Sequence, residues 1–391
     1  MESAARLLRI GNGGIADTSS IAEPEAVAAT SKARFYPNLE AARGVAALMV
    51  ACFHAGGTSY LSADGSHTSL LRDPHLPFHW AALPGQILGN GVGAVILFFV
   101  LSGFVLALTL ERSAESLGQS ALGFFGSRIV RIFPAALTTL ALFVALHAAF
   151  GATLPMSGSF DPLNVMRNAL LLKTDINGVT WSLQFELLGA PLIFAAFWLH
   201  RRFGVVPLAV IFTTLLGLSF ASQWQALFDR PSTFAPLYSF VAGMAAYFYG
   251  RGLVDRLQRP GVALAIGLAC FAMARIVLGF TSVWSGVAET VSSAAIVALL
   301  AFGPFRVMPR FYGRISYSFY LLHALTLPII WSRPDLLGAL VAAGVPRTAI
   351  ALVLLVGSVA AITPLAWLQY LVVEVGSGRL WHAFERRLRL I

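Results

Sequence analysis

Long apolar runs alternate with short polar segments along most of the chain. A transmembrane helix needs roughly 20 mostly apolar residues. Ten runs approach that length, at 39–60, 86–110, 129–150, 181–200, 204–221, 235–250, 261–280, 286–304, 315–332 and 347–372. The stretch 163–173 is too short to cross and carries Arg167, so we expect it to be interfacial or re-entrant, outside the core. The pattern predicts an all-α, polytopic membrane helical bundle of about ten transmembrane helices.

The composition agrees with a membrane protein. Of 391 residues, 57% are hydrophobic and only 12% are charged, whereas soluble domains carry about 25% charged residues. The net charge of +9 could suit nucleic acid, but the basic residues stand in short clusters between the apolar runs. That arrangement favours topology signals and anionic lipid headgroups. We therefore expect a lipid bilayer as partner, and no nucleic acid.

The distribution of Lys and Arg predicts the orientation. With the N-terminus in the cytoplasm, 19 of the 27 basic residues fall in inner segments and six in outer segments, while Arg43 and Arg275 lie within helices. This split obeys the positive-inside rule. Both termini are predicted to face the cytoplasm, in a multi-pass protein of the cell inner membrane.

Three regions are expected. Residues 1–34 are polar and small, and they predict a disordered cytoplasmic tail without a cleaved signal peptide. Residues 35–373 form the membrane domain. Residues 374–391 alternate apolar side chains such as Trp381 and Phe384 with arginines, which predicts an amphipathic cytoplasmic helix on the inner leaflet.

Two polar residues in the first apolar run are the strongest candidates for chemistry. Arg43 and His54 are eleven residues apart, which in a helix is about 16 Å of rise and three turns plus about 20°. Both side chains therefore project from one stripe. Considered alone, Arg43 could be a snorkelling anchor, and His54 could be a packing histidine. Their shared face favours a functional site, with Arg43 at the cytoplasmic edge and His54 deeper.

The fourth run opens with WSLQFE and places Glu186 about one turn inside the outer surface, near the expected depth of His54. A histidine beside a carboxylate can act as a general base held in one tautomer. Ser182 lies on the same helical face as Glu186, and Trp181 precedes it; both are candidate substrate-binding residues. The alternative is a Glu186 that is simply solvated at the interface.

Two further clusters are candidate binding residues. Arg128 and Arg131 share a helical face at the cytoplasmic boundary, and they suit a phosphate ligand as well as ordinary positive-inside anchoring. His323 falls near the middle of the ninth run with Tyr317 nearby. The alternative for His323 is a core histidine bonded to a neighbouring helix.

Other polar residues in the apolar runs have simpler explanations. Ser102 and Gly103 allow close helix approach, and Arg275 is expected to snorkel to the outer surface. Cys52 could carry an acyl group beside His54, but helical geometry puts it on a different face, so packing is preferred. No acidic or cysteine cluster completes a metal site around the loop histidines His75 and His79, so no metal is expected.

Five segments together resemble the integral-membrane acyltransferase-3 family. They are LEAARGVAALMVACFH, FFVLSGF, RIVRIFP, WSLQFE and GRISYSFYLLH, in the family's order, between residues 39 and about 323. Arg43 and His54 match the family's arginine and histidine, and Glu186 matches its acid. The family often has an acidic residue ahead of the double phenylalanine, where this chain has Val95 and Ile96.

The resemblance implies transfer of an acyl group, commonly acetyl, from cytoplasmic acyl-CoA to a hydroxyl of an extracytoplasmic glycan or similar acceptor. His54 would be the general base and Glu186 would orient it. Arg43, Arg128 and Arg131 would recognise CoA phosphates, with acyl-CoA as a substrate and no tightly bound cofactor. The competing reading is a proton-coupled transporter or flippase, against which the absence of paired broken helices in the sequence argues. A scaffold without chemistry would leave the Arg43–His54 stripe unexplained.

Overall fold

A computed structural model describes residues 35–56, 59–62, 65–70, 87, 89–113, 117–220, 237–279 and 282–389. The helices from Pro37 onward belong to one compact unit. The tail predicted at 1–34, and the loop that carries His75 and His79, lie outside the described residues.

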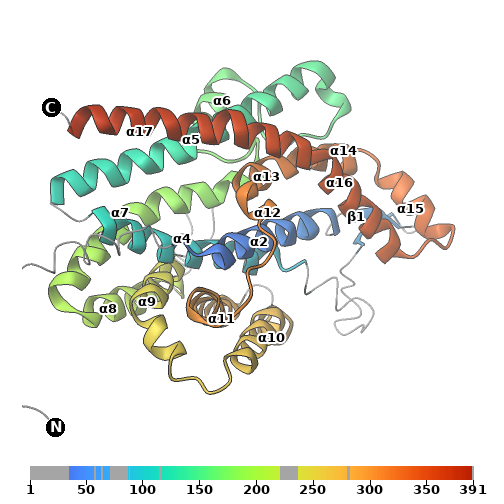
Figure 1. Ribbon diagram of the computed structural model, residues 1–391. Coiled ribbons are helices and arrows are strands. Elements are labelled where there is room, and N and C mark those ends of the chain that lie inside the picture. The colour runs from blue at the N-terminus through green and yellow to red at the C-terminus, as the bar shows by residue number, and fades with distance from the viewer. Residues whose placement is uncertain are drawn as a thin grey trace, which may run out of the picture. The chain divides into compact units, whose positions relative to one another are not determined.

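The described chain is a bundle of helices with one short hairpin (Figure 1). The hairpin pairs β1 (Ser59–Leu61) and β2 (His67–Ser69) antiparallel. The long helices are α2 (Pro37–Gly56), α4 (Gly91–Ser113), α5 (Leu117–Phe150), α7 (Trp181–Phe203), α8 (Val205–Ser219), α9 (Leu237–Val254), α10 (Pro260–Leu278), α11 (Val283–Phe302), α16 (Arg347–Gln369) and α17 (Val375–Arg389). The shorter elements are η1 (Gly151–Thr153), α6 (Pro162–Ala169), η2 (Gly178–Thr180), α12 (Phe311–Arg314), α13 (Ser316–Leu322), η4 (His323–Thr326), α14 (Leu327–Trp331), α15 (Pro334–Ala342) and the π-helical turn η5 (Tyr370–Glu374).

Local sequence explains where several helices begin. The Asp161 side chain accepts from the backbone of Asn164, and Pro162 stands at the first helical position of α6. Ser282 caps α11 in the same way. A capping side chain accepts a hydrogen bond from one of the N–H groups that a helix start leaves unpaired. A proline at the first position has no N–H group that needs a partner. The segment 163–173, expected not to cross the membrane, forms the short helix α6 and the chain after it, and its place at the interface stays a prediction.

Among the described residues, seven helices are long and apolar enough to cross a membrane, and one bent pair would make eight. Ten crossings were predicted. The fifth run forms α8, with 15 residues, and the sixth forms α9, with 18. A polytopic helical bundle accommodates both results, and the number of crossings stays a prediction.

Helix α4 is central and packs against α2, α7, α9 and α11 (Figure 1). Its approach to α9 depends on two glycines. A Cβ on Gly103 would lie 2.0 Å from the carbonyl oxygen of Phe240, and a Cβ on Gly243 would lie 2.0 Å from that of Val100. The two backbones touch at these points, as expected for small residues between membrane helices. The packing interpretation of Gly103 therefore agrees with the structure.

The ninth run forms a helical stretch from Ser316 to Trp331, made of α13, the 3-10 turn η4 and α14. Pro328 stands in the first turn of α14. A proline there cannot donate to the residue four positions back and its ring crowds that carbonyl, which accounts for the 3-10 turn before it. The chain bends by 68° only after Trp331, where α15 begins.

The C-terminal helices run on from one another. α16 continues through η5 into α17, and α17 packs along α5, where Gly126 makes room for the Trp381 ring (Figure 1). α5 itself has 34 residues, about 51 Å at 1.5 Å per residue, which exceeds a hydrocarbon core of about 30 Å. α17 therefore packs on α5, and its place on the inner leaflet as a cytoplasmic C-terminal helix stays a prediction.

Candidate active site

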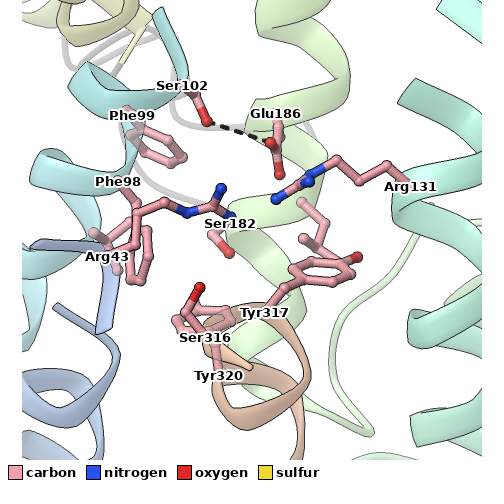
Figure 2. Close-up of a pocket in the computed structure, with 12 residues that line it drawn as sticks. Arg43, Phe98, Phe99, Ser102, Arg131, Ser182, Glu186, Ser316, Tyr317 and Tyr320 are labelled. Atoms are coloured by element: carbon pink, nitrogen blue, oxygen red, sulfur yellow. Dashed lines mark hydrogen bonds between the residues drawn. The ribbon is translucent and has the colours of Figure 1, made fainter. Parts of the chain in front are cut away.

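Five helices enclose a cavity of about 50 Å³ that we call the arginine cavity (Figure 2). Its walls come from α2, α4, α5, α7 and α13. The polar lining is Arg43, Ser102, Arg131, Ser182, Glu186, Ser316, Tyr317 and Tyr320, and the apolar lining is Val95, Phe98, Phe99 and Leu183.

Charged groups converge on this cavity. Figure 2 shows Arg43 and Arg131 extending toward Glu186. Arg128 lies one turn before Arg131 and within electrostatic range of Glu186, while Glu374 of η5 lies within range of Arg43. Among the described residues, three guanidinium groups therefore face two carboxylates, which leaves net positive charge. Guanidinium donors match phosphate oxygens in pairs, so the cavity suits a phosphorylated ligand.

Contacts between α5, α13 and η5 hold the cavity wall in place. The Tyr317 hydroxyl donates to the carbonyl of Ile132 (2.8 Å), and the Arg131 guanidinium carbon lies 5.9 Å from the centre of the Tyr317 ring. The backbone N–H and the hydroxyl of Ser318 both donate to Glu374 Oε1, at 3.1 and 2.5 Å. The arginines are thus set among side chains whose own positions are fixed.

A second cavity of about 90 Å³, the histidine cavity, lies around His54. Its polar lining is His54, Ser157 and Asn177, and the half-exposed indole of Trp331 also lines it. The remaining lining is Phe143, Ile176, Gly178, Val179, Ala324, Leu327 and Pro328.

His54 faces a second histidine. The ring centres of His54 and His323 are 5.2 Å apart. His323 Nδ1 lies 2.5 Å from the carbonyl oxygen of Tyr320, and a carbonyl only accepts, so Nδ1 carries the hydrogen and Nε2 carries the lone pair. Within the described part of the chain, that buried Nε2 has no hydrogen-bond partner. The His323 ring therefore offers a proton acceptor beside His54.

The two cavities meet at Tyr320. Its ring lines the arginine cavity, and its hydroxyl donates to the carbonyl of Val179 (2.9 Å), a residue of the histidine cavity. Arg43 and His54 reach the two cavities from one helix, about 16 Å apart along its axis. The shared stripe predicted from the sequence thus serves two adjoining cavities.

Glu186 does not line the same cavity as His54, beside which the sequence had placed it. It lines the arginine cavity, where Ser102 donates to its Oε1 (3.4 Å). The reason is the chain before α7, since Asn177 and Gly178 line the histidine cavity themselves. Glu186, in the second turn of α7, lines the arginine cavity beside Arg43 and Arg131.

Hydrogen bonds from α6 hold the segment that enters the histidine cavity. The Asp175 carboxylate accepts from Asn164 (3.1 and 3.2 Å) and from Asn168 (2.7 Å), and Asn168 Oδ1 accepts from the backbone of Ile176 (3.2 Å). Burial tends to raise the pKa of Asp175, but the hydrogen bonds from Asn168 and Asn164 outweigh it and the pKa falls below its ordinary value. An ionised Asp175 therefore fixes the approach to Asn177.

Of the two residues predicted to bind substrate at the start of α7, one lines a cavity and the other does not. Ser182 lines the arginine cavity, and its hydroxyl donates to the carbonyl of Val179 (3.2 Å). Trp181 instead packs edge-on against Phe99 and Phe185, with ring centres 6.2 and 5.4 Å away. Trp181 is thus part of the aromatic packing behind the cavity rather than of its lining.

Arg275 does not snorkel to the surface. It forms an ion pair with the fully buried Glu289 (2.8 Å), which also accepts from Asn90 Nδ2 (2.8 Å). The sequence prediction overlooked Glu289, although an acid in the eighth apolar run opposite an arginine in the seventh could have been paired. This cluster ties α10 and α11 to the start of α4.

Sequence reasoning also missed Glu374 and Asn177. Glu374 lies in the π-helical turn η5, and Asn177 stands in a loop with no periodic pattern. No group of three or more His, Cys, Asp or Glu side chains is placed to hold a metal among the residues the structure covers.

Comparisons with known proteins add independent information. The sequence model of the acyltransferase-3 family, an acyltransferase domain, matches residues 36–367. The exopolysaccharide production protein ExoZ of Rhizobium meliloti (strain 1021) is 25% identical over 295 residues, which are 71% of this chain and 88% of that protein. The search of solved structures gave no match.

Proposed function

Because the chain belongs to the acyltransferase-3 family, we propose that it is a membrane O-acyltransferase of the cell inner membrane. It moves an acyl group, acetyl being the expected one, from cytoplasmic acyl-CoA to a hydroxyl of an extracytoplasmic glycan or similar acceptor. One observation carries the proposal: a single helix presents Arg43 to a cavity of converging arginines and His54 to an adjoining cavity.

The donor would bind at the arginine cavity. CoA carries several phosphate oxygens, and among the described residues the guanidinium of Arg43 makes no hydrogen bond, so its donors are available to a ligand. Arg128 and Arg131 add charge from the α5 side. The pantetheine arm would extend past Tyr320 toward His54, over a distance of about 16 Å along α2.

The chemistry would take place at His54. Its ring accepts the proton of the acceptor hydroxyl as that oxygen attacks the thioester carbonyl. The new ester C–O bond forms, the C–S bond breaks, and the leaving thiolate takes the proton back from the imidazolium. His323 lies beside this ring and can hold its orientation. General-base catalysis contributes about 10²–10⁴-fold. Glu186, placed among the arginines, would orient them rather than His54.

The acceptor is expected to be a carbohydrate. The relative ExoZ is named for exopolysaccharide production, which supports a polysaccharide or its precursor. A transporter or flippase remains the competing function, and the 68° bend between Ser316–Trp331 and α15 favours it more than the sequence did, because broken helices line substrate sites in transporters.

Ligand-dependent thermal stability of the detergent-solubilised chain separates the two. A ligand that binds only the folded state stabilises it by about 2.7 kcal/mol at 100 times its Kd. We expect CoA and acetyl-CoA to raise the melting temperature, and pantetheine, which lacks the phosphates, to leave it unchanged. No shift with millimolar CoA would overturn the donor site and favour transport. Surface glycans from cells with and without the gene should differ by about 42 Da per acetyl group, the mass given by its formula.

A further inference from the structure

Asn177 is a buried amide that is only half satisfied. It is 3% exposed and lines the histidine cavity. Its Nδ2 donates to the carbonyl oxygen of Leu321 (3.2 Å). Because that carbonyl can only accept, the NH₂ group must face it and the amide cannot be flipped. Oδ1 therefore faces away from Leu321, and among the described residues it accepts no hydrogen bond.

An unpaired buried acceptor is costly and is an exception in folded proteins. Asn177 cannot move to find a donor for Oδ1, because hydrogen bonds fix its position. Its backbone carbonyl accepts from the N–H and the hydroxyl of Thr180 (3.0 and 2.8 Å), and Asp175 and Asn168 hold the preceding residues. The amide is thus held in place, in a residue that lines the histidine cavity, with an acceptor that no described group satisfies.

The histidine cavity supplies the chemistry of a matching ligand. A ligand hydroxyl that faces His54 would be the one that reacts. A second hydroxyl could donate the hydrogen bond that Asn177 Oδ1 lacks. The half-exposed Trp331 offers an aromatic face to the C–H groups of a sugar ring. A single-hydroxyl alcohol could meet His54 but would leave Oδ1 unpaired.

We propose that Asn177 selects a polyhydroxylated acceptor, with one hydroxyl at His54 and a second donating its hydrogen to Asn177 Oδ1. This inference rests on the proposed function, and it deepens it by assigning a specificity-determining residue for the carbohydrate acceptor. Sites built to hydrogen-bond a hydroxyl discriminate strongly against analogues that lack it.

The test is acetyl transfer from acetyl-CoA by the full chain to two probes, methyl α-D-glucopyranoside and cyclohexanol. The wild-type chain should prefer the glycoside. Asn177→Ala should raise the KM for the glycoside about 10-fold or more, while the cyclohexanol rate and the KM for acetyl-CoA stay unchanged. Asn38→Ala is the matched control. Asn38 is also a buried amide bonded to the backbone, at Met308 (3.1 Å), but it lines neither cavity.

Each other outcome has a defined meaning. An unchanged glycoside KM in Asn177→Ala overturns the inference, and so does a wild-type chain that uses cyclohexanol as well as the glycoside. Equal losses with both probes, or the same loss in Asn38→Ala, make Asn177 structural. If Asn177→Ala does not fold, the wild-type chain is instead assayed with a series of glycosides that each lack one hydroxyl. One of these glycosides should react about 10-fold less efficiently than the parent. Equal efficiency across the series overturns the inference. If CoA does not bind the wild-type chain, it is the proposed function that fails instead.

Discussion

Replacing Arg43 by lysine separates a phosphate ligand from a topological anchor. Both residues carry one positive charge and obey the positive-inside rule equally. Lysine, however, has a point charge on a flexible stem, whereas the guanidinium presents a planar fork of donors. Arg43 extends into the arginine cavity toward Glu186 (Figure 2). Arg43→Lys should therefore insert normally and lose only the geometry of donor recognition.

The structure sets the size of the effect. Arg43 makes no hydrogen bond to a described residue, so its full set of donors can serve a ligand. A fork that grips a phosphate makes two charge-assisted bonds, and lysine can keep one of them. A hydrogen bond to a charged group is worth about 1.5–3 kcal/mol. Since about 1.4 kcal/mol is tenfold in affinity, the KM for acyl-CoA should rise roughly 10- to 150-fold.

The assay is initial acetyl transfer by purified protein as a function of acetyl-CoA concentration. Arg256→Lys is the control for charge alone, because Arg256 is exposed after α9 and lines neither cavity. We expect a raised KM with nearly unchanged kcat in Arg43→Lys, and wild-type values in Arg256→Lys. Wild-type acetyl-CoA dependence in both variants would refute the reasoning and make Arg43 an anchor.

Three further changes test the surrounding structure. Gly103→Ala should lower the melting temperature, because its Cβ would lie 2.0 Å from a backbone carbonyl of Phe240 and overpacking costs about 1–3 kcal/mol; Gly217→Ala, with nothing within 4 Å, should not lower it. The pKa of Asp175 is depressed in the folded chain, so its carboxylate stabilises the fold at pH values above its ordinary pKa of 3.8 and loses that effect as the pH falls through the lower folded value. The stability gap between wild type and Asp175→Asn, followed by chemical unfolding, should therefore shrink in acid, and a gap independent of pH would contradict it. Glu374→Gln keeps an acceptor for its serine partner but removes a negative charge near the arginines, so CoA should bind more tightly by calorimetry; weaker binding would show that the carboxylate helps to hold the donor.

Much of the helical framework could be predicted from the sequence, because apolar runs of sufficient length have few alternatives to helices in a membrane. The run predicted at 181–200 is α7, and the run at 261–280 is α10. Helical geometry also placed Arg43 and His54 on one stripe, and each does line a cavity.

The errors have a common physical cause, which is that tertiary packing decides depth and breaks. Glu186 was assigned to His54 from its position in the run, but it lines the arginine cavity, while Asn177 and Gly178 before α7 line the histidine cavity. The partnership of Arg275 with Glu289 joins two different helices. Periodicity within one run contains no information about which face meets which neighbour. Glu374 lies in a π-helical turn that no sequence pattern predicted.

The most direct test of two cavities with separate roles is a pair of measurements on His54→Ala, CoA-dependent thermal stabilisation and acetyl transfer. The account predicts that CoA raises the melting temperature of this variant as much as that of the wild type, because Arg43 and the arginine cavity are intact. It also predicts that acetyl transfer falls by at least about 10²-fold. Acetyl transfer at the wild-type rate in a folded His54→Ala variant that still binds CoA would contradict it.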